Sequence, residues 1–243
     1  VKRLHDSERE ALRHVRHVIV TSPATARLLA SDYDIAMDRI SVARPGNDPV
    51  PPSRGSGDEA VHLLAVGSIV PRKGYDILVA ALVELKDLPW RLSIVGDPTR
   101  DPDFSKALDQ DIDRFGLRSR IDRLGAVSQQ TLAEHYDRAD LFVLPSRFEG
   151  YGMAFADAIA FGVPVIAARA GAVPETVPAR ASILVPPDDV ASLASTLRPL
   201  IENPAEREKL RAQARAAAQA LPTWRESADI VAHAIGMANG MLA

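Results

Sequence analysis

The chain has 243 residues, of which 47% are hydrophobic and 25% are charged, with a formal net charge of −3 and no cysteine. This composition is that of a soluble globular protein, and the charge gives no sign of a polyanion-binding surface, so nucleic acid is not an expected partner. Without cysteine the chain has no disulfide, thiolate metal site or cysteine nucleophile, and no apolar run approaches the ~20 residues of a transmembrane helix.

The N-terminal part of the sequence, residues 1–46, holds few predicted elements. It starts with neither an initiator methionine nor the apolar core of a signal peptide. We expect either that the chain was processed or trimmed or that an N-terminal portion is absent. We also expect a cytoplasmic location, with peripheral association to a membrane as an alternative. Strands are predicted at 17–21 and 40–43, and Ser22-Pro23 begins a helix, because a serine cap followed by proline is a start signal. These elements are too few for an independent core.

A segment rich in proline and glycine, residues 47–58, follows and is typical of a linker between domains. We therefore expect residues 1–56 to be the remnant of a preceding domain plus a linker. Residues 57–221 are expected to form a complete domain.

In that second domain, short apolar runs alternate regularly with helical patterns. Strands are predicted at residues 62–66, 91–95, 121–124, 141–144, 163–167 and 182–185. Helices are predicted at residues 75–86, 104–115, 129–138 and 152–161, and a helical tail starts at 189 with breaks near Pro204 and Pro222. The apolar runs are continuous rather than alternating, as in strands covered on both faces. We predict an α/β fold, a Rossmann-like doubly wound parallel sheet with helices on both faces and a C-terminal helical tail.

Two adjacent cations, Arg72 and Lys73, follow the first predicted strand of this domain and precede a helix. Ligands of open parallel sheets bind beyond the carboxyl ends of the strands, where such cations can meet a diphosphate. The surrounding segment, residues 67–74, matches neither the P-loop nor the dinucleotide fingerprint. From spacing alone, a solvated basic turn remains the alternative.

The fourth predicted strand of the domain runs into a segment with two glycines and a carboxylate, Glu149. Gly150 and Gly152 stand where a helix begins, and there backbone N–H groups and the helix dipole favour negative charge. Asp157 follows Glu149 by eight residues, which is about two helical turns or ~12 Å along one face. That spacing is about the distance from the hexose to the ribose of a nucleotide sugar, so one carboxylate could accept hydrogen bonds from sugar hydroxyls while the other binds ribose hydroxyls. The alternative is that Glu149 caps the helix and Asp157 is an exposed helical residue.

Other acidic residues and the histidines do not predict a metal site. Two Asp-x-Asp pairs, at 101–103 and 109–111, occupy a charged helical stretch rather than a strand end. The six histidines lack ligand spacing. Glu175, which follows a strand, either caps a helix or faces a cleft.

The segment 148–158, continuing through 161–167, resembles the signature of retaining GT-B glycosyltransferases of the family 4 type (group 1 glycosyltransferases). That signature is a glutamate, seven residues, a second glutamate and then an Ala-x-Gly-x-Pro-Val-Ile-Ala strand. Segments at 66–74, 124–127 and 171–175 agree with it. The resemblance covers about 60–225, the C-terminal donor-binding domain, and residues 10–48 resemble the end of the N-terminal acceptor domain.

The resemblance implies a role for each matching position. Arg72 and Lys73 would neutralise the departing diphosphate, and Glu149 would contact the donor sugar, which makes these three the catalytic candidates. Asp157 would hold the ribose, although the family usually has glutamate there, and Ser68 stands where many members have arginine. The candidate donor-binding residues are Gly67, Ser68, Gly125, Ala126, Val127, Gly150, Tyr151, Gly152, Met153 and Asp157.

The activity implied by the resemblance is transfer of a hexose-type sugar from a nucleoside diphosphate sugar to a hydroxyl acceptor with retention of configuration. No cofactor or metal is implied, and the acceptor is an unspecified glycan, lipid or small molecule. Residues 222–243 would form a helix that crosses back to the first domain, with Trp224 as its packing anchor. The chain alone would bind donor but turn over poorly. A non-catalytic nucleotide-sugar-binding module is the alternative, and an epimerase of the same architecture is a third reading.

Overall fold

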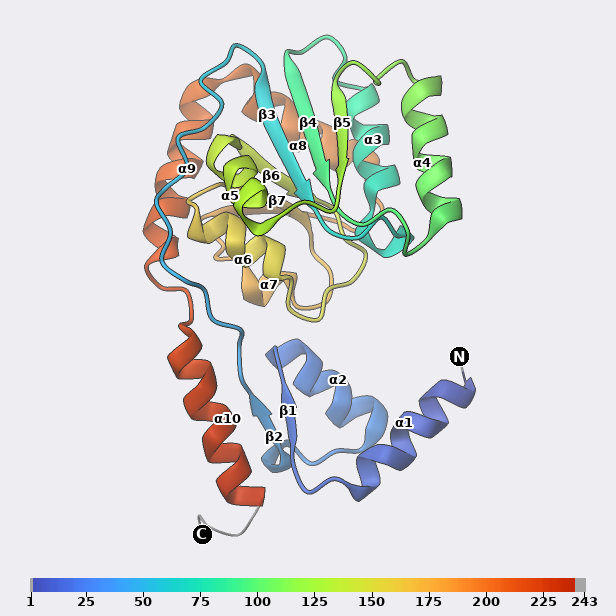
Figure 1. The fold of residues 1–243 in the computed structure, drawn as a ribbon, viewed down its shortest axis with the longest axis vertical. Coiled ribbons are helices and arrows are strands. Elements are labelled where there is room, and N and C mark those ends of the chain that lie inside the picture. The colour runs from blue at the N-terminus through green and yellow to red at the C-terminus, as the bar shows by residue number, and fades with distance from the viewer. Residues whose placement is uncertain (1, 239–243) are drawn as a thin grey trace. The chain divides into compact units, whose positions relative to one another are not determined.

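The computed structural model describes residues 2–238, which divide into two compact units, residues 2–48 with 222–238, and residues 49–221. Figure 1 shows both units and the element labels used below. Within the described residues, no helix combines the length and apolarity needed to cross a membrane.

The first unit contains a parallel pair of short strands, β1 and β2. Its elements are α1 (Lys2–His14), β1 (Val18–Val20), α2 (Pro23–Tyr33), the 3-10 turn η1 (Met37–Arg39), β2 (Ile40–Val42) and α10 (Trp224–Ala238). Ser22 caps α2 as predicted, because its hydroxyl accepts the backbone N–H of Thr25 at 3.1 Å.

Helix α10 packs against β2, and the approach is made by backbone. A Cβ on Gly46 would lie 2.1 Å from the backbone nitrogen of Trp224, so only glycine fits there. Trp224, which the sequence analysis expects to anchor this helix, is 51% exposed among the described residues, and Ala234 is the buried residue of the helix.

The second unit is built on a six-stranded parallel sheet in the order β5-β4-β3-β6-β7-β8. Its strands are β3 (Val61–Val66), β4 (Trp90–Val95), β5 (Ile121–Gly125), β6 (Leu141–Leu144), β7 (Val165–Ala168) and β8 (Ser182–Val185). The chain runs outward from β3 to β5, returns through α5 to β6 beside β3, and then runs the other way to β8. The predicted doubly wound α/β fold is therefore confirmed.

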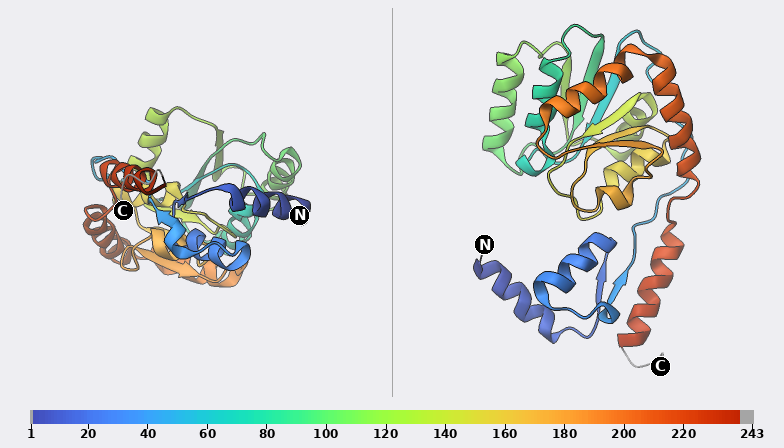
Figure 2. Two further views of the ribbon diagram at one scale, coloured as in Figure 1. Left: turned by 90° about the horizontal axis from the view of Figure 1, so that it is seen from below. Right: turned by 180° about the vertical axis from the view of Figure 1, so that it is seen from behind.

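Helices cover both faces of this sheet (Figures 1 and 2). They are α3 (Tyr75–Val83), α4 (Pro102–Arg114), α5 (Gln129–Arg138), α6 (Met153–Ala160), α7 (Val173–Thr176), α8 (Val190–Glu202) and α9 (Pro204–Ala218). Helices α3, α4 and α8 lie on one face and α5 and α6 on the other, as the back view of Figure 2 makes clear. The helix starts follow side-chain caps: Asp101, Ser128, Asp189 and Asn203 each accept a backbone N–H of the first turn.

The proline-rich segment before β3 is fastened to the second unit. Ser53, 1% exposed, donates to the carbonyl oxygens of Asp137 and Ala139, and Ser56 donates to Asp140 at 2.6 Å. Arg211 of α9 donates to the same Asp140 carboxylate at 2.8 Å. The unit therefore begins at Pro49, ahead of the start at residue 57 expected from composition, because these bonds fix residues that look like a linker in the sequence.

Candidate functional site

The two loops at the reversal of strand order lie side by side at the carboxyl edge of the sheet. The loop after β3 forms a 3-10 turn, Pro71–Lys73, which ends at Gly74 with φ 71°. A Cβ at Gly74 would lie 2.1 Å from the carbonyl oxygen of Pro145, in the loop after β6, so this close approach requires glycine. Crevices at such a switch point are where open α/β sheets bind ligands.

The three residues proposed from the sequence as catalytic meet at this point. Lys73 Nζ lies 2.7 Å from Glu149 Oε1, and Arg72 Nη1 lies 3.3 Å from Glu149 Oε2. The side chains of Lys73 and Glu149 are 12% and 6% exposed, whereas that of Arg72 is 47% exposed. Two cations thus converge on one carboxylate, which leaves an excess of positive charge suited to binding an anion.

Arg147, which the sequence did not single out, joins the same two loops. Its guanidinium binds Asp76 at 3.0 and 2.7 Å through Nη1 and Nη2, and Asp188 at 2.7 Å through Nε. Nη1 also donates to the carbonyl oxygen of Pro71, and the Arg147 backbone N–H donates to that of Arg72 at 2.8 Å. Hydrogen bonding to Asp76 raises the pKa of Arg147, with Asp188 adding to the rise against the effect of burial.

The backbone around Glu149 is held from the loop after β7 and from helix α7. The N–H of Ala172 donates to the carbonyl oxygen of Glu149 at 2.8 Å. A Cβ on Gly171, where φ is 54°, would lie 2.3 Å from that same oxygen. Thr176 Oγ1 donates to the carbonyl oxygen of Tyr151 at 2.5 Å, so the turn before α6 is fixed at both ends.

Tyr75 supports the other side of the site and was also missed from the sequence. Its buried hydroxyl donates to the carbonyl oxygen of Gly67 at 2.6 Å and so fixes the point where β3 ends. Burial raises the pKa of Tyr75, and the negative charge of Glu149 adds to the rise. Beside it, Ser68 is half-buried, and Gly67 lies against the Lys73 side chain.

The relation between Glu149 and Asp157 differs from the one predicted. Helix α6 begins at Met153 with Gly152 as its N-cap, so Glu149 lies in the loop and neither caps the helix nor shares two helical turns with Asp157. Asp157 lies within α6 and is half-buried rather than exposed. Burial raises the pKa of Asp157 to about 6.

The remaining predicted positions lie at the carboxyl end of the edge strand β5. Gly125 ends that strand, and its carbonyl oxygen accepts the N–H of Gly96 at 2.9 Å. Gly125 lines a pocket of about 470 Å³ together with Pro98, Ser105, Asp109, Arg118, Arg123 and Leu124. Ala126 is exposed and Val127 half-buried. Asp109, which the sequence placed in an Asp-x-Asp pair, is paired with Arg118 and Arg123.

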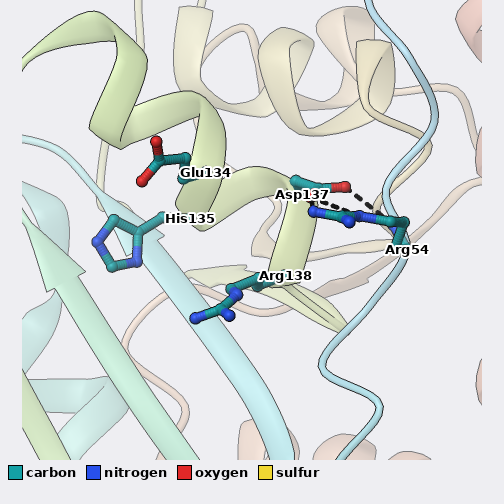
Figure 3. A pocket seen from close by; sticks show the side chains of 5 residues that line it. All are labelled: Arg54, Glu134, His135, Asp137 and Arg138. Atoms are coloured by element: carbon teal, nitrogen blue, oxygen red, sulfur yellow. Dashed lines mark hydrogen bonds and ion pairs between the residues drawn. The ribbon is translucent and has the colours of Figure 1, made fainter.

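Another pocket of about 400 Å³ lies beside helix α5 and contains none of the predicted site residues. Figure 3 shows its lining: Glu134, His135, Asp137 and Arg138 from α5, and Arg54 from the segment before β3. Arg54 forms an ion pair with Asp137 there, so the charged groups serve to attach that segment.

Comparison with known proteins finds a match to the family of glycosyl transferases group 1 over residues 60–203. A D-inositol 3-phosphate glycosyltransferase of Arthrobacter sp. (strain FB24) is 31% identical over 245 residues, which is 94% of this chain and 57% of that relative. The chain thus spans little more than half the length of this curated relative.

Two solved structures share the fold. Sucrose-phosphate synthase from Thermosynechococcus elongatus has a TM-score of 0.87 and 25% identity, over 100% of this chain and 63% of that one. Anabaena HepE in complex with UDP and glucose has a TM-score of 0.82 and 23% identity, over 92% of this chain and 64% of that one.

Proposed function

The chain belongs to the group 1 glycosyl transferases, and from this premise we propose that it carries the donor half of an enzyme that transfers a hexose-type sugar from a nucleoside diphosphate sugar to a hydroxyl acceptor. The observation that carries the proposal is the meeting of Lys73, Arg72 and Glu149 at the switch point of the sheet. Developing negative charge on a departing diphosphate is strongly stabilised by preorganised cations in a sheltered site.

Each predicted residue has a proposed task in this reaction. Lys73 and Arg72 bind the diphosphate. Glu149, which is released when they do so, accepts hydrogen bonds from hydroxyl groups of the donor sugar. Asp157 binds the ribose, and the backbone of the glycine-containing turn before α6 contributes N–H groups to sugar or phosphate oxygens. The residues expected around the phosphates and the base are Gly67, Ser68, Gly125, Ala126, Val127, Gly150, Tyr151, Gly152 and Met153.

The mechanism proposed is the retaining one of family 4 enzymes, in which the acceptor hydroxyl attacks the donor sugar from the same face that the diphosphate leaves. It uses no metal or cofactor. Residues 1–48 and 222–243 are proposed to belong to the acceptor side, so the chain alone transfers sugar poorly. The acceptor is a glycan, lipid or small molecule with a free hydroxyl group. NMR of the product's anomeric configuration, in the full-length enzyme, tests retention, and an inverted product contradicts it.

Calorimetric titration with UDP, GDP and ADP, first without metal and then with magnesium, tests the donor site. We expect saturable binding of one nucleotide without metal, and its loss in Lys73→Ala. Equal binding by the Lys73→Ala chain would contradict the assignment of the diphosphate to this lysine.

A nucleotide-sugar-binding module without chemistry is the second candidate. Asp157 and Ser68 are the features in its favour, because aspartate is one methylene shorter than the family's glutamate and reaches less far towards a ribose, and Ser68 stands where many members have arginine. Restoring glutamate with Asp157→Glu in the full-length protein separates the two. A rise in transfer supports the enzyme, and absence of transfer in both forms supports the binding module.

A further inference from the structure

The guanidinium of Arg147 is almost fully used within the protein. A guanidinium has five N–H donors. Here Nε binds Asp188, Nη1 binds Asp76 and the carbonyl oxygen of Pro71, and Nη2 binds Asp76. Such a group has little left to offer a ligand, although it stands two residues before Glu149.

The partners of Arg147 lie in two parts of the chain, the connection from β3 to α3 and the loop after β8. Asp76 is in the first turn of α3, Pro71 begins the turn that carries Arg72 and Lys73, and Asp188 follows β8. Asp188 has φ 58°, in the left-handed region that aspartate adopts more readily than most residues, and its carboxylate accepts Arg147 Nε at 2.7 Å. One side chain thus fixes the turn Pro71–Lys73, called the cation turn below, relative to the loop that carries Glu149.

A second contact makes the coupling mutual. Arg72 Nη1 donates to the carbonyl oxygen of Phe148 at 2.6 Å, while the Arg147 N–H donates to the carbonyl oxygen of Arg72 at 2.8 Å. The cation turn and the Glu149 loop are therefore tied through both backbone and side chain.

Resting on the proposed function, we propose that Arg147 is a positioning residue for nucleoside diphosphate binding. It sets the place of Lys73 and Arg72 opposite Glu149 without itself touching the ligand. Groups that bind a ligand act at full strength only when their positions are held to within about 0.5 Å. The hydrogen bonds of the Arg147 guanidinium hold Lys73 and Arg72 in this way. A loss of Arg147 then weakens binding through the cations, beyond any effect on stability.

A matched control is present in the same chain. Arg198 of α8 also joins two elements through carboxylates and a carbonyl oxygen, since it binds Asp87 at 2.7 Å, Glu202 at 3.3 Å and the carbonyl oxygen of Glu84 at 3.0 Å. None of these residues belongs to the proposed donor site. Substitution of Arg198 thus reports the effect of losing a structural arginine alone.

The experiment is titration of whichever of UDP, GDP and ADP the unaltered chain binds into Arg147→Met, Arg147→Lys and Arg198→Met, with thermal unfolding of each. We expect Arg147→Met to raise Kd about tenfold, as a displaced binding group does, and Arg198→Met to change it less than about twofold. Arg147→Lys keeps the charge but not the fork, so its Kd stays near that of Arg147→Met. An Arg147→Met chain that melts earlier yet binds with unchanged Kd overturns the proposal.

A double-variant cycle with Lys73→Met supplies the decisive readout. If Arg147 acts through the cation turn, its substitution weakens binding much less in the Lys73→Met background than in the unaltered chain. Fully additive losses overturn the proposal. Should Arg147→Met fail to fold, Asp76→Asn removes the paired carboxylate more gently and is subject to the same expectations. If the unaltered chain binds none of the three nucleotides, the proposed donor site itself fails, and this inference fails with it.

Discussion

Two buried carboxylates flank strand β6, and they are held in different ways. Asp140, immediately before the strand, accepts bonds from Ser56 Oγ at 2.6 Å, the Ser56 N–H at 3.3 Å, the His62 N–H at 2.9 Å and Arg211 at 2.8 Å. Glu149, shortly after the strand, is paired with two long cationic side chains at 2.7 and 3.3 Å.

The ion pair of Asp140 is structural, whereas that of Glu149 is one in which an incoming anion can replace the carboxylate as partner of the cations. Backbone N–H groups and a short hydroxyl cannot leave Asp140 without unfolding the segment that carries them. Burial alone raises the pKa of Asp140, but the bonds from Ser56, His62 and Arg211 together bring it below its ordinary value. The side chains of Lys73 and Arg72 can instead turn from Glu149 to an incoming anion while the backbone stays in place, and for Arg72 this also breaks its bond to the carbonyl oxygen of Phe148.

The largest expected effect comes from breaking the structural pair with Asp140→Asn. Arg211 then keeps a buried charge without a counter-ion, and the free energy of unfolding falls by about 3–4 kcal/mol. Urea unfolding followed by circular dichroism measures this. Nucleotide binding by the folded protein should stay unchanged, and a matching loss of affinity would show that the two ends of β6 are not independent.

Glu149→Gln is the corresponding change at the exchangeable pair and should cost less stability. We expect a loss of about 1–2 kcal/mol, because Lys73 loses its partner but can reach solvent. The affinity for a nucleoside diphosphate should rise several-fold, since the anion no longer competes with the carboxylate. Calorimetry of both forms checks this, and weaker binding by the glutamine form would count against the exchange.

Asp157 is a third carboxylate of the second unit, and its effect on stability depends on pH. Its pKa in the folded protein is about 6, above that of an unfolded aspartate, so the folded state favours the protonated form. The stabilisation from protonation is complete below pH ~4 and is lost as pH rises through about 6, by on the order of 1–3 kcal/mol. Urea unfolding of the unaltered chain and Asp157→Asn at pH 4 to 8 should show their difference changing across that window. A constant difference would contradict the raised pKa.

The smallest expected effect is that of Tyr75→Phe, which removes one hydrogen bond at the ligand end of the sheet. The carbonyl oxygen of Gly67 loses its hydroxyl donor, at a cost of about 1 kcal/mol. Thermal unfolding measures this. Ser56→Ala removes a comparable bond at the Asp140 end, and only the tyrosine variant should also weaken nucleotide binding.

Much of the second unit was predictable because its strands are continuous apolar runs bounded by clear turn and cap signals. Helix α5 and strands β6 and β8 have the predicted bounds to the residue. Helix α3 ends at Val83, three residues earlier than predicted, where a turn takes over. Helix α1 was not predicted, since its sequence is mainly polar and charged.

The site was predictable in part for the same reason. Arg72, Lys73 and Glu149 stand beside recognisable strand ends, and parallel strands bring such ends together. Arg147 carries no local signal, because its partners Asp76 and Asp188 lie 71 and 41 residues away. The burial of Asp157 is likewise set by packing that no spacing reveals.

The fastening of the segment before β3 bears on where this protein can be cut. A fragment that starts at residue 57 would expose the Asp140 carboxylate and leave Arg211 facing it without Ser56, and it would lose the bonds of Ser53 to the end of α5. A fragment 49–221 keeps these bonds. For the same reason a protease should cleave intact protein before residue 49 or near residue 222 in preference to the proline-rich stretch, whose composition makes it look like the easiest place to cut.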